Sequence, residues 1–130
     1  MGSYKQAFFV NRRPKKYRYK FNRKLNSCPQ RKGIVIQLRF VKPKKPNSAI
    51  RKIALCKLTS KKTFNRTHKA LVYIPGQGHN LHKHSRVLVR AGRIPDLPGL
   101  HYRMIRGKYD LSWTETFTRV NRRSKYGVPR

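Results

Sequence analysis

The chain has 130 residues, of which 34 are Lys or Arg and only 3 are Asp or Glu, so its formal charge at neutral pH is +31. Such a chain repels itself, and binding to a polyanion relieves the repulsion, which makes nucleic acid the first partner to consider. The few scattered acids argue against paired-carboxylate catalysis. A membrane surface is disfavoured because no long apolar run or basic amphipathic helix is visible. We therefore expect neither enzymatic activity nor a membrane partner.

The sequence divides into a basic arm over residues 1–33, a barrel-like domain over residues 34–112 and a basic tail over residues 113–130. The arm has no acidic residue, and aromatic side chains are interleaved with its cations. It buries too little apolar surface to offset its ordering cost, so we expect the free arm to be disordered. Its aromatic side chains could stack on bases or pack against the chain's own domain. The arm cations expected to bind RNA are Arg12, Arg13, Lys15, Lys16, Arg18, Lys20, Arg23 and Lys24.

Five short strands are predicted after the arm. From Ile34 to Val41 the side chains follow a period of two, which is typical of a β-strand. Turn signals separate the candidates at close spacing, and no convincing long helix occurs. This pattern predicts a mainly β fold, a small closed or partly closed barrel whose simplest five-stranded form is the oligonucleotide-binding (OB) barrel. The predicted strands are Ile34–Val41, Ile50–Leu58, Lys69–Ile74, Arg86–Arg90 and His101–Arg106.

A rigid basic loop, Lys42–Lys52, leads into the second predicted strand. Pro43 and Pro46 fix their own backbone angle φ and bias the preceding lysines toward extended backbone. Asn47 and Ser48 then offer hydrogen-bond donors and acceptors at the tip. Lysines at the base could hold phosphates while the tip reaches 2′-hydroxyls and base edges, which suits folded RNA. The alternative is a solvated surface turn.

Two further loops carry polar groups. In Pro75–Asn80 the glycines permit a tight turn, from which Gln77, His79 and Asn80 could contact RNA. In Gly92–Gly99, two prolines stiffen the loop around Asp96, which either stabilises its own loop, for example by pairing with Arg93, or belongs to a tip that meets a ligand opposite the first loop. We expect Trp113 to be a core or seam aromatic rather than a base-stacking platform.

Metal and redox sites are disfavoured. His79, His82 and His84 are closely spaced, but no Cys or carboxylate lies nearby to complete a tetrahedral zinc site. Cys28 and Cys56 have no C-x-x-C spacing, so reduced thiols are expected. We predict no metal and no cofactor. A metal- or redox-dependent enzyme and a free-standing, cold-shock-like binder of single-stranded nucleic acid remain as alternatives to an RNA-embedded protein.

Several blocks taken together resemble one family, the small-subunit ribosomal protein S-twelve of the bacterial and organellar type. They span roughly residues 25–128 and occur in the same order. The blocks are Leu25–Gly33, Pro43–Lys52, Tyr73–Leu81, His84–Ser85, Val87–Arg90, Gly92–Arg93, Asp96–Gly99, Tyr102, Arg106–Gly107 and Arg123–Gly127.

The resemblance implies an OB barrel whose arm threads through ribosomal RNA (rRNA) and whose two proline-pinned loops face the decoding centre. The implied partners are small-subunit rRNA, the aminoacyl-site tRNA with its mRNA codon, and neighbouring ribosomal proteins. The Asp96 position is methylthiolated in some members of the family. The implied decoding residues are Lys44, Lys45, Pro46, Asn47, Ser48, Gln77, His79, Asn80, Arg93, Asp96, Leu97 and Pro98.

The chain also departs from the family pattern. Pro95 stands where the family has a lysine, which removes one cation beside Asp96 and stiffens the tip. Before Leu25 the arm matches poorly. The Lys, Asn, Ile, Phe and Tyr richness of the sequence favours an organelle-encoded mitochondrial protein over one of the plastid or the bacterial cytoplasm.

Overall fold

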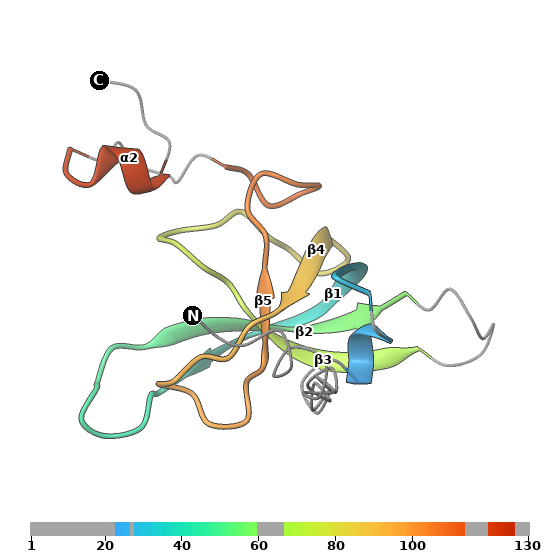
Figure 1. Ribbon diagram of the computed structural model, residues 1–130, viewed down its shortest axis with the longest axis horizontal. Helices are drawn as coiled ribbons and strands as arrows, with labels where there is room; N and C mark the ends of the chain where they lie inside the picture. Colours follow the sequence, from blue (N-terminus) through green and yellow to red (C-terminus); the bar gives the residue numbers. More distant parts are fainter. Residues whose placement is uncertain (1–22, 27, 60–66, 114–119, 127–130) are drawn as a thin grey trace, which may run out of the picture.

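The computed structural model describes residues 23–26, 28–59, 67–113 and 120–126 of the chain (Figure 1). Five strands form the body of this part, preceded by a 3-10 turn and followed by one helical turn. In chain order the elements are η2 (Arg23–Leu25), β1 (Gln30–Val41), β2 (Arg51–Leu58), β3 (His68–Tyr73), β4 (Arg86–Ala91), β5 (Tyr102–Met104) and α2 (Arg123–Tyr126). No helix in this part is both long and apolar enough to cross a bilayer.

The strands close into a barrel in the order β1-β2-β3-β5-β4. All neighbouring pairs are antiparallel except β3 and β5, which are parallel. The predicted mainly β class and five-stranded, OB-like barrel are therefore confirmed. In this topology the β1–β2 and β4–β5 loops and the surface of strands 2 and 3 are the usual nucleic-acid-binding parts.

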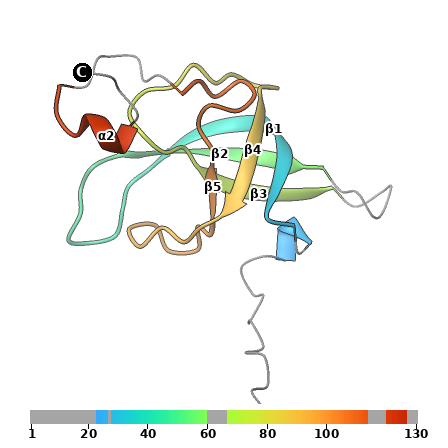
Figure 2. The same ribbon diagram turned by 45° about the horizontal axis from the view of Figure 1, so that its top comes forward.

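β1 begins at Gln30, so the predicted start at Ile34 is wrong. Its first residues pair with β4, where Gln30 lies opposite Arg90, and its later residues pair with β2. Figure 2 shows the strand curving along both neighbours. The charged segment that starts β1 concealed this pairing, although the alternation continues through it and Arg31 is buried. Gly33 occurs where the strand meets both neighbours, and a Cβ there would lie 3.1 Å from Leu58 Cδ2.

β5 is shorter than predicted. It ends at Met104 because the chain then turns into a hairpin, in which Lys108 forms an isolated bridge with Leu111. Trp113, at the end of this hairpin, is 56% exposed. Of the two predicted positions of Trp113, the core is therefore wrong, whereas its close approach to Gly107 fits a seam position.

Two apolar clusters hold the barrel together. The larger one fills the interior and includes Leu25, which ties the η2 turn to the barrel. Cys56 is also buried there, and burial raises the pKa of its thiol to about 12, so this cysteine is an apolar core residue. Cys28 and Cys56 are both free thiols. The smaller cluster, Ile53, Ile94, Leu97 and Leu100, lies at the base of the β4–β5 loop.

Candidate nucleic-acid interface

The two predicted loops lie side by side at one end of the barrel. The first loop, residues 42–50, joins β1 to β2, and the second loop, residues 92–101, joins β4 to β5. In Figure 1 they are the green and the orange loop that project at the lower left. Their backbones are in direct contact, because the Lys44 amide donates a hydrogen bond of 3.0 Å to the Asp96 carbonyl. The first loop also turns on itself, with the Asn47 amide 3.1 Å from the Lys44 carbonyl.

Asp96 joins the loops through its side chain as well. The Asn47 side-chain amide donates to Oδ1 at 2.8 Å, and the Arg51 guanidinium donates to Oδ2 at 2.9 Å. The Arg51 and Asp96 side chains are 30% and 31% exposed, so water screens the ion pair and its contribution to stability is about 0–1 kcal/mol. The pair therefore fixes the relative position of the loops more than it stabilises the fold. The predicted ion pair between Asp96 and Arg93 within the second loop is therefore wrong, because Asp96 forms its ion pair with Arg51.

The second loop is held from below by apolar packing. Leu97 is 4% exposed and packs with Ile53, Ile94 and Leu100. Short turns follow one another here, with the Leu97 amide donating to the Ile94 carbonyl and the Leu100 amide to the Leu97 carbonyl, each at 3.3 Å. Leu97 is therefore placed to anchor the loop rather than to contact a ligand. The other predicted tip residues are exposed, namely Lys44, Lys45, Pro46, Asn47, Ser48, Arg93 and Pro98.

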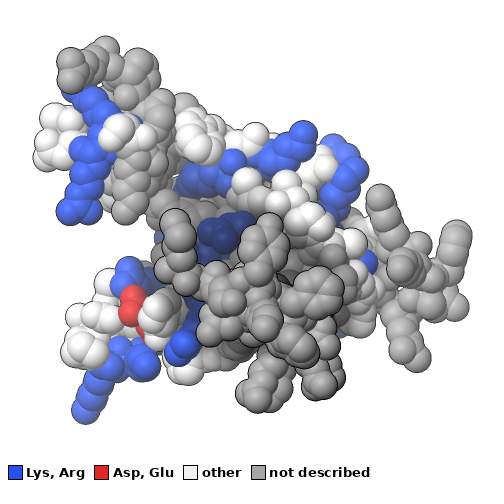
Figure 3. Space-filling model, viewed as in Figure 1, with Lys and Arg blue, Asp and Glu red and all other residues white. Residues whose placement is uncertain are grey.

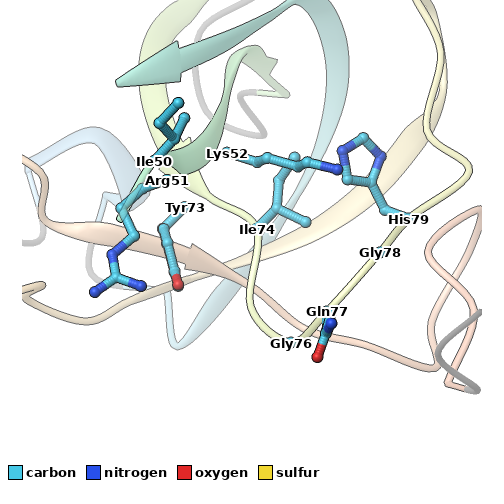
Figure 4. A pocket seen from close by; sticks show the side chains of 9 residues that line it. All are labelled: Ile50, Arg51, Lys52, Tyr73, Ile74, Gly76, Gln77, Gly78 and His79. Atoms are coloured by element: carbon cyan, nitrogen blue, oxygen red, sulfur yellow. The ribbon is translucent and has the colours of Figure 1, made fainter. Parts of the chain in front are cut away.

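The predicted Pro75–Asn80 turn lies beside the start of β2, where the first loop ends. Gln77 and His79 line a pocket of about 190 Å³ together with Arg51, Lys52 and Tyr73 (Figure 4). Since Arg51 also binds Asp96, this one residue is shared by the pocket and the contact between the loops. Asn80 is exposed on the same turn but does not line the pocket.

Arg106 holds this turn in place. Its Nε donates to the Pro75 carbonyl at 2.7 Å, a second guanidinium nitrogen donates to the Gly78 carbonyl, and a third lies 3.3 Å from the Ser112 carbonyl. One cation therefore satisfies carbonyl groups from two chain segments, which is the fork geometry that suits arginine.

His79 is held in its neutral form. The Leu81 amide donates to His79 Nδ1 at 3.2 Å, which requires an unprotonated nitrogen. Burial lowers the pKa of His79 below its ordinary value of 6.5, and the positive charges of Lys52 and Arg106 and the neighbouring His82 lower it further. Figure 4 shows the Lys52 side chain extended toward the His79 ring. At neutral pH this imidazole is a hydrogen-bonding group without charge.

The surface around the loops is strongly basic. Figure 3 shows a single patch of acidic atoms in the lobe at the lower left, with Lys and Arg atoms around it. Asp96 is the acid of the two loops, and Arg51 neutralises it, whereas Lys42, Lys44, Lys45 and Arg93 are exposed. An anionic ligand would therefore meet uncompensated positive charge here.

The predicted arm residues divide into two groups. Arg12, Arg13, Lys15, Lys16, Arg18 and Lys20 lie outside the described residues. Arg23 and Lys24 are in η2, where Lys24 Nζ donates to the Lys69 carbonyl at 2.6 Å. Lys24 thus binds the edge of β3 and helps to attach the end of the arm to the barrel.

Residues that sequence reasoning missed are mostly arginines that bind the protein itself. Arg51, Arg103 and Arg106 contact Asp96, the Arg93 carbonyl and the Pro75–Gly78 turn respectively. In a chain with so many cations, no sequence spacing distinguishes these three arginines from the others. Only the strand order of the barrel brings their partners close. Within the described ranges, no three His, Cys, Asp or Glu side chains are grouped so that they could hold a metal ion.

Comparison with known proteins shows the family to which the chain belongs. A family model described as Ribosomal protein S12/S23 matches residues 18–127. The small ribosomal subunit protein uS12m of Acanthamoeba castellanii is 51% identical over 117 residues, which cover 90% of this chain and 87% of that protein. Its mitochondrial origin confirms the predicted mitochondrial localisation. The chain therefore belongs to the ribosomal protein S12/S23 family and is a structural protein of the small ribosomal subunit in mitochondria.

Proposed function

We propose that this protein binds small-subunit rRNA and that its two loops line the decoding centre at the aminoacyl-tRNA site, where they contribute to the accuracy of translation. The single observation that carries the proposal is the contact between the loops, in which the Asp96 side chain binds both Asn47 and Arg51. It presents the exposed residues Lys44–Ser48, Pro95 and Pro98 as one surface.

The proposed mechanism is pre-organisation. A loop that is already fixed loses little conformational freedom when it meets RNA, so more of the contact energy is available for binding. Correct codon–anticodon pairs present one geometry to the fixed polar tip, and mismatched pairs present another, so only the correct pair gains the full set of contacts. Lys44 and Lys45 would hold backbone phosphates, and Asn47 and Ser48 would meet bases or 2′-hydroxyls.

Misreading by mitochondrial ribosomes that carry variant protein tests the decoding role. Lys45→Ala and Asn47→Ala should change misreading of a near-cognate reporter codon while subunits assemble normally. Arg51→Ala should also change misreading, because it releases Asp96. The expected change in the misreading rate is up to about fivefold, which corresponds to an interaction of about 1 kcal/mol. The matched controls are Lys57→Ala and Arg39→Ala, which remove exposed cations on strands β2 and β1. Unchanged misreading with defective assembly would contradict the decoding role.

The arm is proposed to bind rRNA during assembly. Removing the charges of residues 12–20 should leave fewer assembled small subunits on a sucrose gradient. If about ten phosphates are neutralised by the whole chain, the logarithm of the binding constant for rRNA should fall with the logarithm of salt concentration at a slope of about −9. Normal assembly without the arm would refute this part.

The cold-shock-like alternative is not favoured by the strand surfaces. That reading predicts a row of exposed aromatic side chains on the sheet. On the strands that the structure describes, Phe40 at the end of β1 is the exposed aromatic residue, and the outward side chains of β2 and β3 include Lys52, Lys57 and Lys69.

The proposed partners are therefore folded rRNA, the tRNA and mRNA of the decoding centre, and neighbouring ribosomal proteins. Modification of Asp96 stays a prediction, which mass spectrometry of the isolated protein can test.

A further inference from the structure

A second exposed feature lies at the other end of β5. After Met104 the chain forms a short hairpin, residues 105–113, with Tyr109 at its tip and Trp113 at its end. Figure 1 shows β5 running between the second loop at the bottom and this hairpin at the top. The hairpin is therefore separate from the two loops proposed for decoding.

The hairpin backbone is firmly attached to the barrel. The Ile105 amide donates to the Leu88 carbonyl of β4 at 2.9 Å, and the Leu111 side chain is fully buried in the main core. Within the hairpin, the Gly107 amide donates to the Leu111 carbonyl at 2.9 Å. Asp110 binds β4 twice, because its amide donates to the Arg86 carbonyl at 3.0 Å and its Oδ2 accepts from the Arg86 amide at 2.6 Å. The tip is thus attached to the start of β4 by two hydrogen bonds.

Tyr109 occupies an unfavourable position for its side chain. Its φ of +56° lies in the left-handed region, which favours glycine and is rare for a bulky residue. The residue is nevertheless 38% exposed and belongs to neither apolar cluster, so core packing does not account for the choice of tyrosine. Backbone strain that packing does not explain points to a functional use of the side chain.

Two cations lie over the ring of this partly exposed residue. Lys32 Nζ and Lys108 Nζ each lie 5.5 Å from the centre of the Tyr109 ring. Trp113 provides a second exposed ring on the same hairpin, and it lies directly against Gly107, where an added Cβ would be 2.9 Å from Trp113 Cε3. Exposed aromatic rings flanked by lysines suit unpaired nucleotides, since the rings stack on bases and the ammonium groups bind phosphates.

We propose that Tyr109 and Trp113 form a second RNA contact, on which unpaired bases of rRNA stack while Lys32 and Lys108 bind the adjacent phosphates. The positive charge of the hairpin favours RNA over a basic neighbouring protein as the occupant. This contact rests on the proposed binding of rRNA but not on the decoding role, because it concerns the opposite end of β5, so it can fail while the decoding role holds.

Fluorescence gives a direct test, because Trp113 is the only tryptophan in the chain. The full-length protein is titrated with a short single-stranded oligoadenylate and, separately, with an RNA duplex of equal length, at a salt concentration that weakens purely ionic binding. Stacking should quench Trp113 emission with the single strand much more than with the duplex. Equal emission changes with both RNAs, or none with either, would overturn the proposal.

Affinities measured by fluorescence anisotropy of a labelled oligoadenylate extend the test. Trp113→Ala and Tyr109→Gly should each weaken binding about fivefold to hundredfold, as removal of a stacked ring does. Tyr109→Phe should retain binding. Leu71→Ala, which removes an equally exposed apolar side chain from β3, is the matched control and should have no effect. Because glycine is favoured at the φ of Tyr109, Tyr109→Gly should raise or preserve thermal stability while it weakens binding. A loss of binding that simply followed a loss of stability would contradict the proposal.

A measurement on the assembled small subunit does not require the free chain to fold. Ultraviolet irradiation of isolated mitochondrial small subunits, followed by mass spectrometry, should yield peptides in which Tyr109 or Trp113 is cross-linked to a nucleotide. Cross-links of these two residues to a neighbouring protein, with RNA adducts found elsewhere in the chain, would overturn the proposal in favour of a protein contact.

Discussion

The two ends of β5 are stabilised in different ways. The second loop, at one end, is joined to the first loop by polar side chains that converge on Asp96, with about a third of that carboxylate side chain exposed. The hairpin, at the other end, is fixed by backbone hydrogen bonds and by the buried Leu111. Variants of the loops should therefore change geometry with little cost in stability, whereas variants of the hairpin base should change stability directly.

The largest effect is expected at the base of the hairpin. Leu111→Ala removes a fully buried side chain and should lower the free energy of unfolding by about 2–5 kcal/mol. Denaturant unfolding of the purified chain measures the loss. Leu71→Ala, at an exposed position on β3, is the control and should cost much less. Similar losses for both variants would mean that the hairpin is not anchored as the structure indicates.

A smaller loss is expected where the hairpin meets the Pro75–Gly78 turn. Arg106→Ala leaves carbonyl groups of this turn without their charged donor, so unfolding should become easier by about 1–3 kcal/mol. Hydrogen exchange should show faster opening around residues 75–81, while the first loop is unaffected. Unchanged exchange in this turn would show that Arg106 does not hold it.

The contact between the loops should be weaker still. A double-mutant cycle of Arg51→Ala and Asp96→Ala is expected to give a coupling of about 0.2–1 kcal/mol, because both side chains are partly exposed. The coupling should decrease as salt is added. A coupling well above this range would place the loops among the stabilising elements of the fold and would remove the contrast with the hairpin.

The smallest effect is expected from the titration of His79. Its pKa is lowered in the folded state, so between the folded and unfolded pKa values the unfolded chain binds more protons and stability falls as pH decreases below about 6.5. His79→Asn keeps an acceptor for the Leu81 amide but cannot titrate, so it should flatten this part of the pH profile of unfolding. An unchanged profile would assign the pH dependence to the other histidines.

Much of the fold could be predicted from the sequence, because strand periodicity and turn residues are local signals. The five strands were placed within a few residues, yet the start of β1 was missed because Gln30–Lys32 reads as part of a basic arm. The buried face of β1 was equally hard to infer. Both alternating sets of residues contain apolar side chains, and a register shift between Val35 and Gln37 interrupts the alternation, so that Val35 is buried and Leu38 also packs against the main core, while Phe40 is exposed.

The exposed loop residues could be predicted because proline, asparagine and lysine in close sequence indicate a stiff basic loop. The partner of Asp96 could not, since Arg51 is one of 34 cations and is far away in the chain. The conformation of Tyr109 could not be predicted either, because its φ of +56° depends on the way the hairpin closes. Local sequence patterns thus indicate which loops could contact a ligand. The long-range topology determines which side chains in those loops are bound by the protein itself and which stay available to the ligand.

The pairing of β1 with β4 sets an order for synthesis. Because Gln30–Ile34 must wait for Arg86–Arg90, the nascent chain exposes an unpaired strand edge until most of the protein has been made. A fragment that stops before residue 86 should retain that open edge and be prone to aggregation. The sheet can therefore close only late in translation, when most of the polypeptide has left the ribosome.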